Sequence, residues 1–322
     1  MVHSLARKRF LKILVTLSLL IALAVIIDWP VFRRVVTSVD WVLLIPLLLI
    51  QWVSRLAEAL QLWLVIRFIG RSVSLSRVFL SNALATFYGF ILPGHILATA
   101  PKWLVLSRAT GSRADVLSAI IYNRLAFLVP PIFVGSVALG YSDIFSDNRL
   151  KYSLFFVGIG IVLATFLLFY KRTGAMVLGA MLWVTHKCPD GLRNAGSTFV
   201  GSFSRLQEFN VGKHLIVYAL STFVALLRIF AFIYAAWLVS TDVPPESLAL
   251  AYAVIVVLAL FPLTLGNIGI RESVLISVLS LYGVAPAESL TIGLVLFLEH
   301  VLFAIVGGGF QLRLASERSG SE

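Results

Sequence analysis

The feature that most constrains this chain is a series of long apolar stretches separated by short polar loops. Six of them reach about the 20 residues that an α-helix needs to cross the hydrocarbon core of a bilayer. None alternates apolar and polar residues as a β-barrel strand does. The sequence therefore predicts an all-α, polytopic integral membrane protein with about six spans. The predicted spans are residues 10–27, 41–66, 116–139, 152–170, 215–239 and 289–312.

The composition excludes a soluble domain and gives little support to enzymatic chemistry. Charged residues make up 13% of the chain and hydrophobic residues 60%, whereas a soluble domain has about one-quarter charged residues. The single cysteine, Cys188, excludes a thiolate cluster, and the five histidines show no metal-ligand spacing. We therefore expect no metal, no cofactor and no catalytic activity.

The net charge of +11 raises nucleic acid as a partner, but the positions of the charges favour a membrane explanation. Cytoplasmic loops of membrane proteins collect Lys and Arg, and the chain begins with Arg7, Lys8, Arg9 and Lys12 ahead of the first apolar stretch. We expect no nucleic-acid partner. The same rule places both termini in the cytoplasm, and we expect the protein in the bacterial inner membrane.

Two further apolar segments have the same predicted side at both ends, so neither can be a simple span. Residues 78–97 have basic loops on both flanks, which places both flanks in the cytoplasm. Residues 248–282 lie between loops, around Asp242 and around Glu288, that contain no Lys or Arg, which places both flanks outside. The basic residues flanking the first segment are Arg67, Arg71 and Arg77 before it, and Lys102, Arg108 and Arg113 in the loop after it.

Each of these segments is broken near its middle or end, and we interpret them as two re-entrant hairpins that enter from opposite faces. Irregular backbone at membrane depth is tolerated only where protein or water covers it. Its free N–H groups and the positive end of a half-helix could bind an anion; the alternative is a plain break satisfied by neighbouring helices. The tips contain Pro93 and Gly94 in the first hairpin, and Pro262, Gly266 and Gly269 in the second.

The predicted order of span, hairpin and span occurs twice, over 41–140 and over 213–312, in opposite orientation. Two glycine pairs, Gly111 with Gly135 and Gly283 with Gly307, have equal spacing in the two halves. Inverted repeats with broken helices are the construction of many secondary transporters, whose site lies at mid-membrane between the repeats. The chain 1–322 is predicted to be one transmembrane domain. Residues 171–212 would form a cytoplasmic loop with an interfacial helix near 174–186.

Ionisable residues inside the predicted spans are the candidate functional residues, because each costs about 2.5 to 3.5 kcal/mol at a helix centre. Arg55 and Glu58 could neutralise each other three residues apart. Arg124 and Arg228 have no acidic residue within one turn, so each either binds an anion or pairs with Glu272 or Glu299. The candidate substrate-binding residues also include Lys102 and one polar residue of the second hairpin tip, Asn267. The full set is Arg55, Glu58, Lys102, Arg124, Arg228, Asn267, Arg271, Glu272, Glu299 and His300.

Residues 262–272, PLTLGNIGIRE, followed by the sequence LYGV at 281–284, resemble the signature of the lysylphosphatidylglycerol synthase transmembrane-region family. Ser81-Asn82, residues 92–94, Lys102 and residues 123–125 are similar to an earlier motif of the same family. The resemblance implies a flippase-like membrane domain. Members that flip aminoacylated phosphatidylglycerol also carry a soluble aminoacyl transferase domain, which is not found up to Glu322, so the resemblance implies at most the lipid-translocating half.

These observations predict translocation of a membrane lipid across the inner membrane by a flippase or scramblase. The substrate would be an anionic phospholipid, an aminoacyl-lipid, a glycolipid or a polyprenyl-linked lipid. Two alternatives stay open at this point. One is a non-transporting accessory protein whose partner is a lipid-modifying enzyme or glycosyltransferase, and the other is a secondary transporter of a small anion. The sequence does not indicate the oligomeric state.

Overall fold

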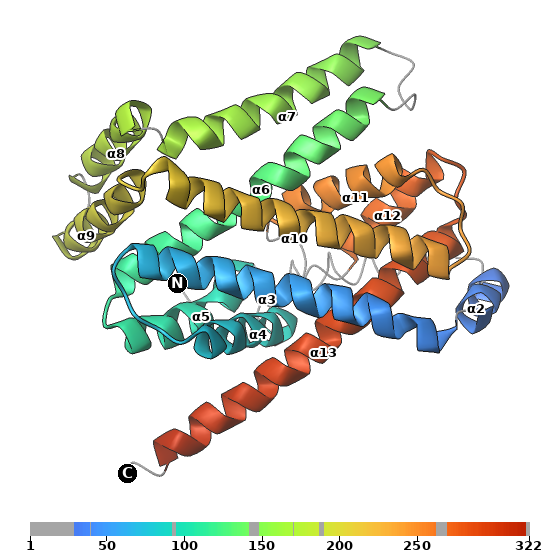
Figure 1. The fold of residues 1–322 in the computed structure, drawn as a ribbon, viewed down its shortest axis with the longest axis horizontal. Helices are drawn as coiled ribbons and strands as arrows, with labels where there is room; N and C mark the ends of the chain where they lie inside the picture. Colours follow the sequence, from blue (N-terminus) through green and yellow to red (C-terminus); the bar gives the residue numbers. More distant parts are fainter. Residues whose placement is uncertain are drawn as a thin grey trace, which may run out of the picture.

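A computed structural model describes residues 29–38, 40–91, 95–141, 148–169, 171–186, 190–261 and 269–319, and all regular secondary structure in these ranges is helical (Figure 1). The predicted all-α polytopic fold is confirmed. In chain order the elements are α2 (Trp29–Ser38), η1 (Trp41–Leu43), α3 (Leu44–Phe68), α4 (Leu75–Ile91), α5 (His95–Thr110), α6 (Arg113–Tyr141), α7 (Asn148–Phe169), α8 (Lys171–His186), α9 (Asp190–Gln207), α10 (Val211–Leu238), α11 (Pro245–Leu258), α12 (Ile270–Ser280) and α13 (Pro286–Ser319).

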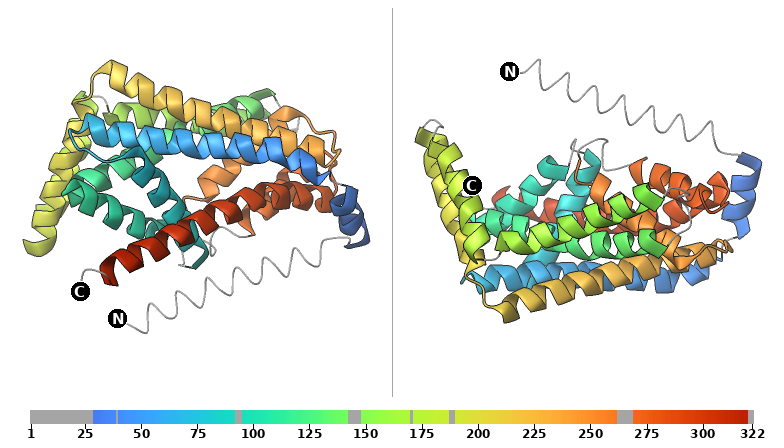
Figure 2. Two further views of the ribbon diagram at one scale, coloured as in Figure 1. Left: turned by 60° about the horizontal axis from the view of Figure 1, so that its bottom comes forward. Right: turned by 90° about the horizontal axis from the view of Figure 1, so that it is seen from above.

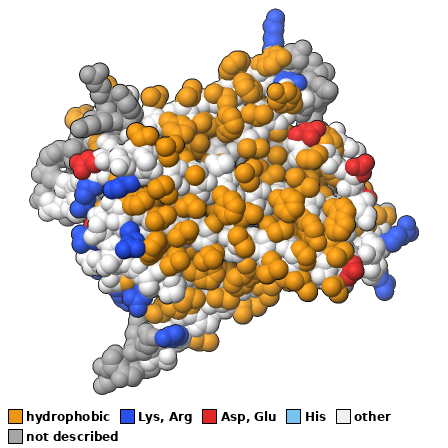
Figure 3. All heavy atoms as spheres, viewed as in Figure 1, with side chains coloured by type: hydrophobic (Ala, Val, Ile, Leu, Met, Phe, Trp, Pro, Cys, Tyr) orange, Lys and Arg blue, Asp and Glu red, His pale blue; other side chains and the backbone are white. Residues whose placement is uncertain are grey.

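Five helices of the described chain, α3, α6, α7, α10 and α13, are long and apolar enough to cross a membrane. They coincide with five of the six predicted spans, and the sixth, 10–27, lies outside the described residues. Apolar side chains cover the middle of the molecule, and charged side chains gather towards its two ends (Figure 3). This surface is what a bilayer requires of a protein that crosses it.

The two predicted hairpins correspond to pairs of short helices that pack against each other, α4 with α5 and α11 with α12. The longest, α4, has 17 residues and measures about 26 Å at 1.5 Å per residue, less than the hydrocarbon thickness of about 30 Å. Their tips at 92–94 and 262–268 lie outside the described residues, together with Pro93, Gly94, Pro262, Gly266 and Asn267. The re-entrant path through those tips stays a prediction.

One prediction about the first hairpin is wrong. We expected its second arm to end near residue 97 and Lys102 to lie in a cytoplasmic loop. Instead α5 continues through Pro101 to Thr110, so Lys102 lies within the helix. The residues after Lys102 are apolar, and Leu106 is completely buried, so extending the helix keeps this face in the core.

Helix contacts follow the same plan in the two halves of the chain. The first long helices, α3 and α10, lie side by side in opposite directions (Figure 1). The last helix of each half packs against the first arm of the other half's hairpin, α6 against α11 and α13 against α4. A twofold relation between 41–140 and 213–312 would produce this pattern, and it supports the predicted inverted repeat.

Turn geometry supports the same relation in finer detail. After α3, the N–H of Gly70 donates to the carbonyl of Arg67 and that of Arg71 to Ile66. After α10, Ser240 and Thr241 make the same pair of bonds to carbonyls three and five residues back. Gly70 and Ser240 both have positive φ, 84° and 57°, and stand 170 positions apart. The two halves thus end their first long helix in the same turn.

The equally spaced glycines also occupy matching places. Gly111 and Gly283 have positive φ, 71° and 80°, in the turns before α6 and α13. A Cβ on Gly135 would overlap the Ala253 side chain of α11, and one on Gly307 would overlap the Ala83 backbone of α4. The close approach of each long helix to the opposite hairpin therefore requires glycine at this position.

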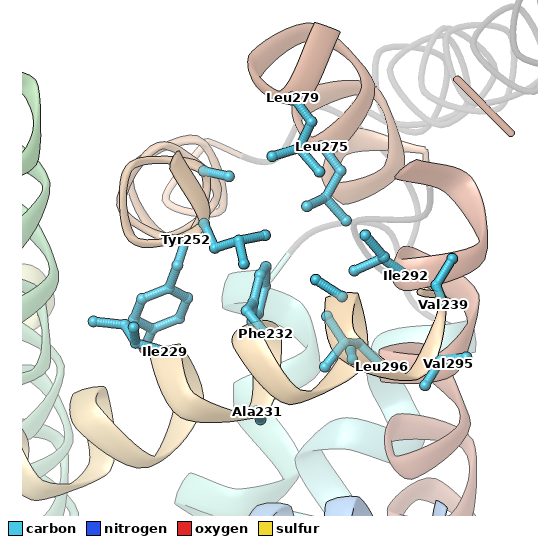
Figure 4. Packing of buried hydrophobic residues seen from close by; sticks show 14 of the residues in the cluster. Ile229, Ala231, Phe232, Val239, Tyr252, Leu275, Leu279, Ile292, Val295 and Leu296 are labelled. Atoms are coloured by element: carbon cyan, nitrogen blue, oxygen red, sulfur yellow. The ribbon is translucent and has the colours of Figure 1, made fainter. Parts of the chain in front are cut away.

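Two large hydrophobic clusters form most of the core, one towards each end of the bundle, and two small ones accompany them in the described chain. The first joins α10, α11, α12 and α13 through residues such as Phe232, Tyr252 and Leu275 (Figure 4). The second lies towards α9 and includes Leu62 and Tyr122. On α3 the first cluster ends with Leu47 and the second begins with Ala59. The stretch between them carries Arg55 and Glu58.

The segment 171–212 contains two helices, α8 and α9, that pack together and stand across one end of the bundle (Figure 2). Helix α9 inserts Phe203 and Leu206 into the second core cluster. Its Arg205 pairs with Asp115 at the start of α6, and Arg71 donates to the same carboxylate at 2.7 Å. Helix α8 leaves Met176 and Trp183 exposed, and its position at the membrane interface stays a prediction.

The close contact at Gly307 predicts a stability difference between two glycines of one helix. Gly307→Ala should destabilise the protein by about 1–3 kcal/mol, because the new methyl group meets backbone atoms of α4 that cannot move without separating the helices. Gly309→Ala is the matched control, since nothing lies within 4 Å of its added Cβ and alanine is the better helix former. Thermal unfolding in detergent measures both; equal loss in the two variants would contradict the packing described.

Candidate functional site

Charged residues predicted inside the membrane come together around the stretch of α3 that lies between the two core clusters. The best-buried pair joins α3 to α13. Arg55 donates from Nε to Oε1 of Glu299 at 2.9 Å and from Nη2 to Oε2 at 3.1 Å. Its guanidinium also lies 4.7 Å from the ring centre of Phe303. Glu299 is 1% exposed, so this bidentate pair is the charge interaction most isolated from water in the network.

His300 completes this group. Its Nε2 lies 3.2 Å from Nη2 of Arg55, and its Nδ1 lies 3.2 Å from Oε2 of Glu299. The sequence offered Glu58 as the partner of Arg55, three residues along the same helix. That contact exists at 3.6 Å but is the longer of the two, so the main partner of Arg55 comes from another helix.

Glu58 instead forms its shortest contact with Arg228 of α10. Arg228 donates from Nη2 to Oε2 of Glu58 at 2.8 Å and from Nε to Oγ of Ser54 at 3.2 Å. The sequence left Arg228 with either an anion or a pairing with Glu272 or Glu299, and the structure supplies a different acid. Glu58 and Arg228 are 170 positions apart, the separation that relates Gly70 to Ser240. The pair therefore joins equivalent positions of the two halves.

At the second hairpin, Arg271 and Glu272 form the first turn of α12. Arg271 donates from Nε to Oε1 of Glu272 at 3.1 Å, and its guanidinium lies 5.0 Å from the ring centre of Phe297. The other carboxylate oxygen accepts the N–H of Gly269 at 2.9 Å. The helix N-terminus predicted to be open to an anion is therefore occupied by the protein's own carboxylate.

Lys102 and Arg124 differ from the other cations of the network. Within the described residues, neither forms a hydrogen bond or an ion pair. Lys102 on α5 interacts electrostatically with Glu58 and with Arg124 on α6, and both side chains are half-buried. The described network holds five cations and three carboxylates, with His300 taken as neutral. The two positive charges in excess correspond to these two residues.

Contacts link five of the ten candidate residues, Arg55, Glu58, Arg228, Glu299 and His300, and a separate contact joins Arg271 to Glu272. Lys102 and Arg124 lie close enough to interact electrostatically, and the tenth candidate, Asn267, lies outside the described residues. His300 contacts Arg55 and Glu299 and lies within electrostatic range of Arg271. Sequence reasoning missed Ser54, which accepts from Arg228, and Tyr252, which lies beside the same guanidinium. No local sequence signal marks these two residues, because each lies beside an arginine of another helix. The described part of the chain holds no group of three metal-ligating side chains.

With this geometry in place, the comparison with known families is decisive. Residues 9–308 match the family described as the lysylphosphatidylglycerol synthase TM region. The chain belongs to this family. The resemblance seen in the two motifs is confirmed, and the match concerns a membrane region rather than a catalytic domain. No curated protein and no solved structure matches the chain significantly.

The burial of Glu299 predicts a large effect of neutralising it. Glu299→Gln should destabilise the protein by about 3–5 kcal/mol, because it removes the main charged partner of the Arg55 guanidinium in a largely buried site. Thermal unfolding in detergent measures the loss. The double variant with Arg55→Met should recover most of it, since no unpaired charge remains.

Glu288→Gln is the control for this prediction. It makes the same substitution in the first turn of the same helix, where no ion pair is found in the described chain, and should leave the melting temperature nearly unchanged. A melting temperature for Glu299→Gln equal to that of Glu288→Gln would show that the pair contributes nothing.

Proposed function

We propose that this protein translocates the headgroup of an anionic or amphipathic lipid across the bacterial inner membrane, while the acyl chains stay in the bilayer. Its family is a membrane domain associated with lipid handling. The observation that carries the proposal is the network of charges between the two halves of an otherwise apolar bundle, with Lys102 and Arg124 in no ion pair within the described residues.

A purely structural role would not require this excess of charge. Each cation at membrane depth costs about 2.5–3.5 kcal/mol to insert, and pairing with a carboxylate offsets that cost. Arg55, Arg228 and Arg271 have such partners. In the described part of the chain Lys102 and Arg124 form no such pair, and their presence favours a hydrated path or a bound anion at this position.

The arrangement of the helices suggests how such a path would open. The halves contact one another along α3 and α10 and through the packing of each hairpin on the opposite half. In transporters built from inverted repeats, rocking of one half against the other exposes a central site to each side in turn. A headgroup held by the network would then leave on the far side while its tails remain in lipid.

The orientation proposed for this movement follows from the charges at the two ends. Exposed Arg67 and Arg108 lie at the end of α3 and α5 that would face the cytoplasm, while Asp242 and Glu246 follow α10 at the other end. Basic residues collect on the cytoplasmic side, so both termini would lie in the cytoplasm.

Purified protein in liposomes tests this function. With fluorescent phosphatidylglycerol in both leaflets, an external quencher should reach only the outer leaflet of protein-free vesicles, but nearly all of the label when the protein is present. Absence of protein-dependent scrambling would reject lipid translocation and favour an accessory protein. Uptake of radioactive phosphate without lipid scrambling would instead favour an anion transporter.

A further inference from the structure

The two cations that form no ion pair in the described chain lie on adjacent helices, at similar distances from the turn that joins these helices. Lys102 is eight residues from the end of α5 at Thr110, and Arg124 is eleven residues from the start of α6 at Arg113. At 1.5 Å per residue these are about 12 and 16 Å from the shared turn, close to half of the hydrocarbon thickness. α5 and α6 pack against each other, so the two charges face a common region.

The carboxylates of the network are already committed to other groups. Both oxygens of Glu299 accept from Arg55. Glu272 accepts from Arg271 and from the N–H of Gly269. Glu58 is held by Arg228 at 2.8 Å and lies 3.6 Å from Arg55. The hairpin tips at 92–94 and 262–268 contain no acidic residue in their sequence. Glu58 also attracts Lys102 from a greater distance, but no carboxylate of the described network forms an ion pair with Lys102 or Arg124.

Two like charges in one weakly polar region repel each other, and an anion placed between them removes this cost. A lysine ammonium and an arginine guanidinium both bind phosphate oxygens, the second through two parallel hydrogen bonds. Both side chains are half-buried, so they remain reachable. Their combined charge matches a group that carries two negative charges.

We infer that Lys102 and Arg124 form the headgroup site and that it selects phosphorylated lipids whose headgroup carries two negative charges, such as a phosphate monoester or a diphosphate. A zwitterionic headgroup leaves the site uncompensated. An aminoacylated headgroup with net positive charge adds to the repulsion and is excluded. The inference rests on the proposed function for its lipid component.

Binding to the purified full-length protein tests this selectivity. Fluorescent phosphatidic acid in detergent micelles is the probe, and phosphatidylcholine, lysylphosphatidylglycerol and inorganic phosphate are the competitors. Phosphatidic acid should bind at least tenfold more tightly than either competing lipid. Equal competition by phosphatidylcholine or lysylphosphatidylglycerol would overturn the selectivity, and equal competition by inorganic phosphate would assign the site to a soluble anion instead.

Three variants locate the site. Lys102→Met and Arg124→Gln should each reduce phosphatidic acid binding at least tenfold and abolish the preference over phosphatidylcholine. Neither should lower the melting temperature, because each removes a charge that has no partner within the described residues. Arg108→Gln is the control, since it removes an exposed cation from the same helix as Lys102, and should bind like the unmodified protein. Retained selectivity in both site variants would overturn the assignment.

The scrambling assay separates this inference from the function on which it rests. Scrambling of phosphatidylglycerol and phosphatidylcholine with no binding preference for phosphatidic acid would support translocation and overturn the selectivity. Selective binding that depends on Lys102 and Arg124, without any scrambling, would support the site and overturn translocation.

Discussion

The contact between α3 and α10 depends on the requirement that a charge in the membrane interior find an opposite charge. Glu58 and Arg228 each stand near the middle of a long apolar helix; Glu58 has only the more distant Arg55 on its own helix, at 3.6 Å, and Arg228 has no acidic residue within one turn. Their 2.8 Å ion pair satisfies both and sets the register of the two helices. Hydrogen bonds from Gln61 to Ser221 and from Tyr234 to the Leu43 carbonyl, on either side, continue the same antiparallel alignment.

The remaining elements are arranged around this contact. Arg55, one turn from Glu58, draws in α13 through Glu299, and α13 in turn packs on the first hairpin at Gly307. Gly135 gives α6 the corresponding contact with the second hairpin. A small number of ion pairs, and two glycines that allow close packing, thus hold together helices that are far apart in sequence. On α3, the two large hydrophobic clusters lie on either side of Arg55 and Glu58.

Much of this could be predicted from the sequence, because hydropathy and loop charge act locally. They located five spans that the described helices confirm, and they identified the residues that form the network. Partner choice could not be predicted, since Arg55 joins Glu299 and Arg228 joins Glu58 across 244 and 170 residues. The error at Lys102 has a related cause: a basic residue after a proline is typical of a loop, but buried apolar residues beyond it extend α5.

The network also separates two roles that look alike in the sequence. Arg55, Arg228 and Arg271 are held by carboxylates and position helices, whereas Lys102 and Arg124 lack such partners in the described structure. The most direct test of this distinction is a cryo-electron microscopy map of the protein in nanodiscs that contain phosphatidic acid. The account predicts headgroup density between Lys102 and Arg124, with the Glu58–Arg228 pair intact. A map in which both cations contact carboxylates and no lipid density lies between the halves would contradict it.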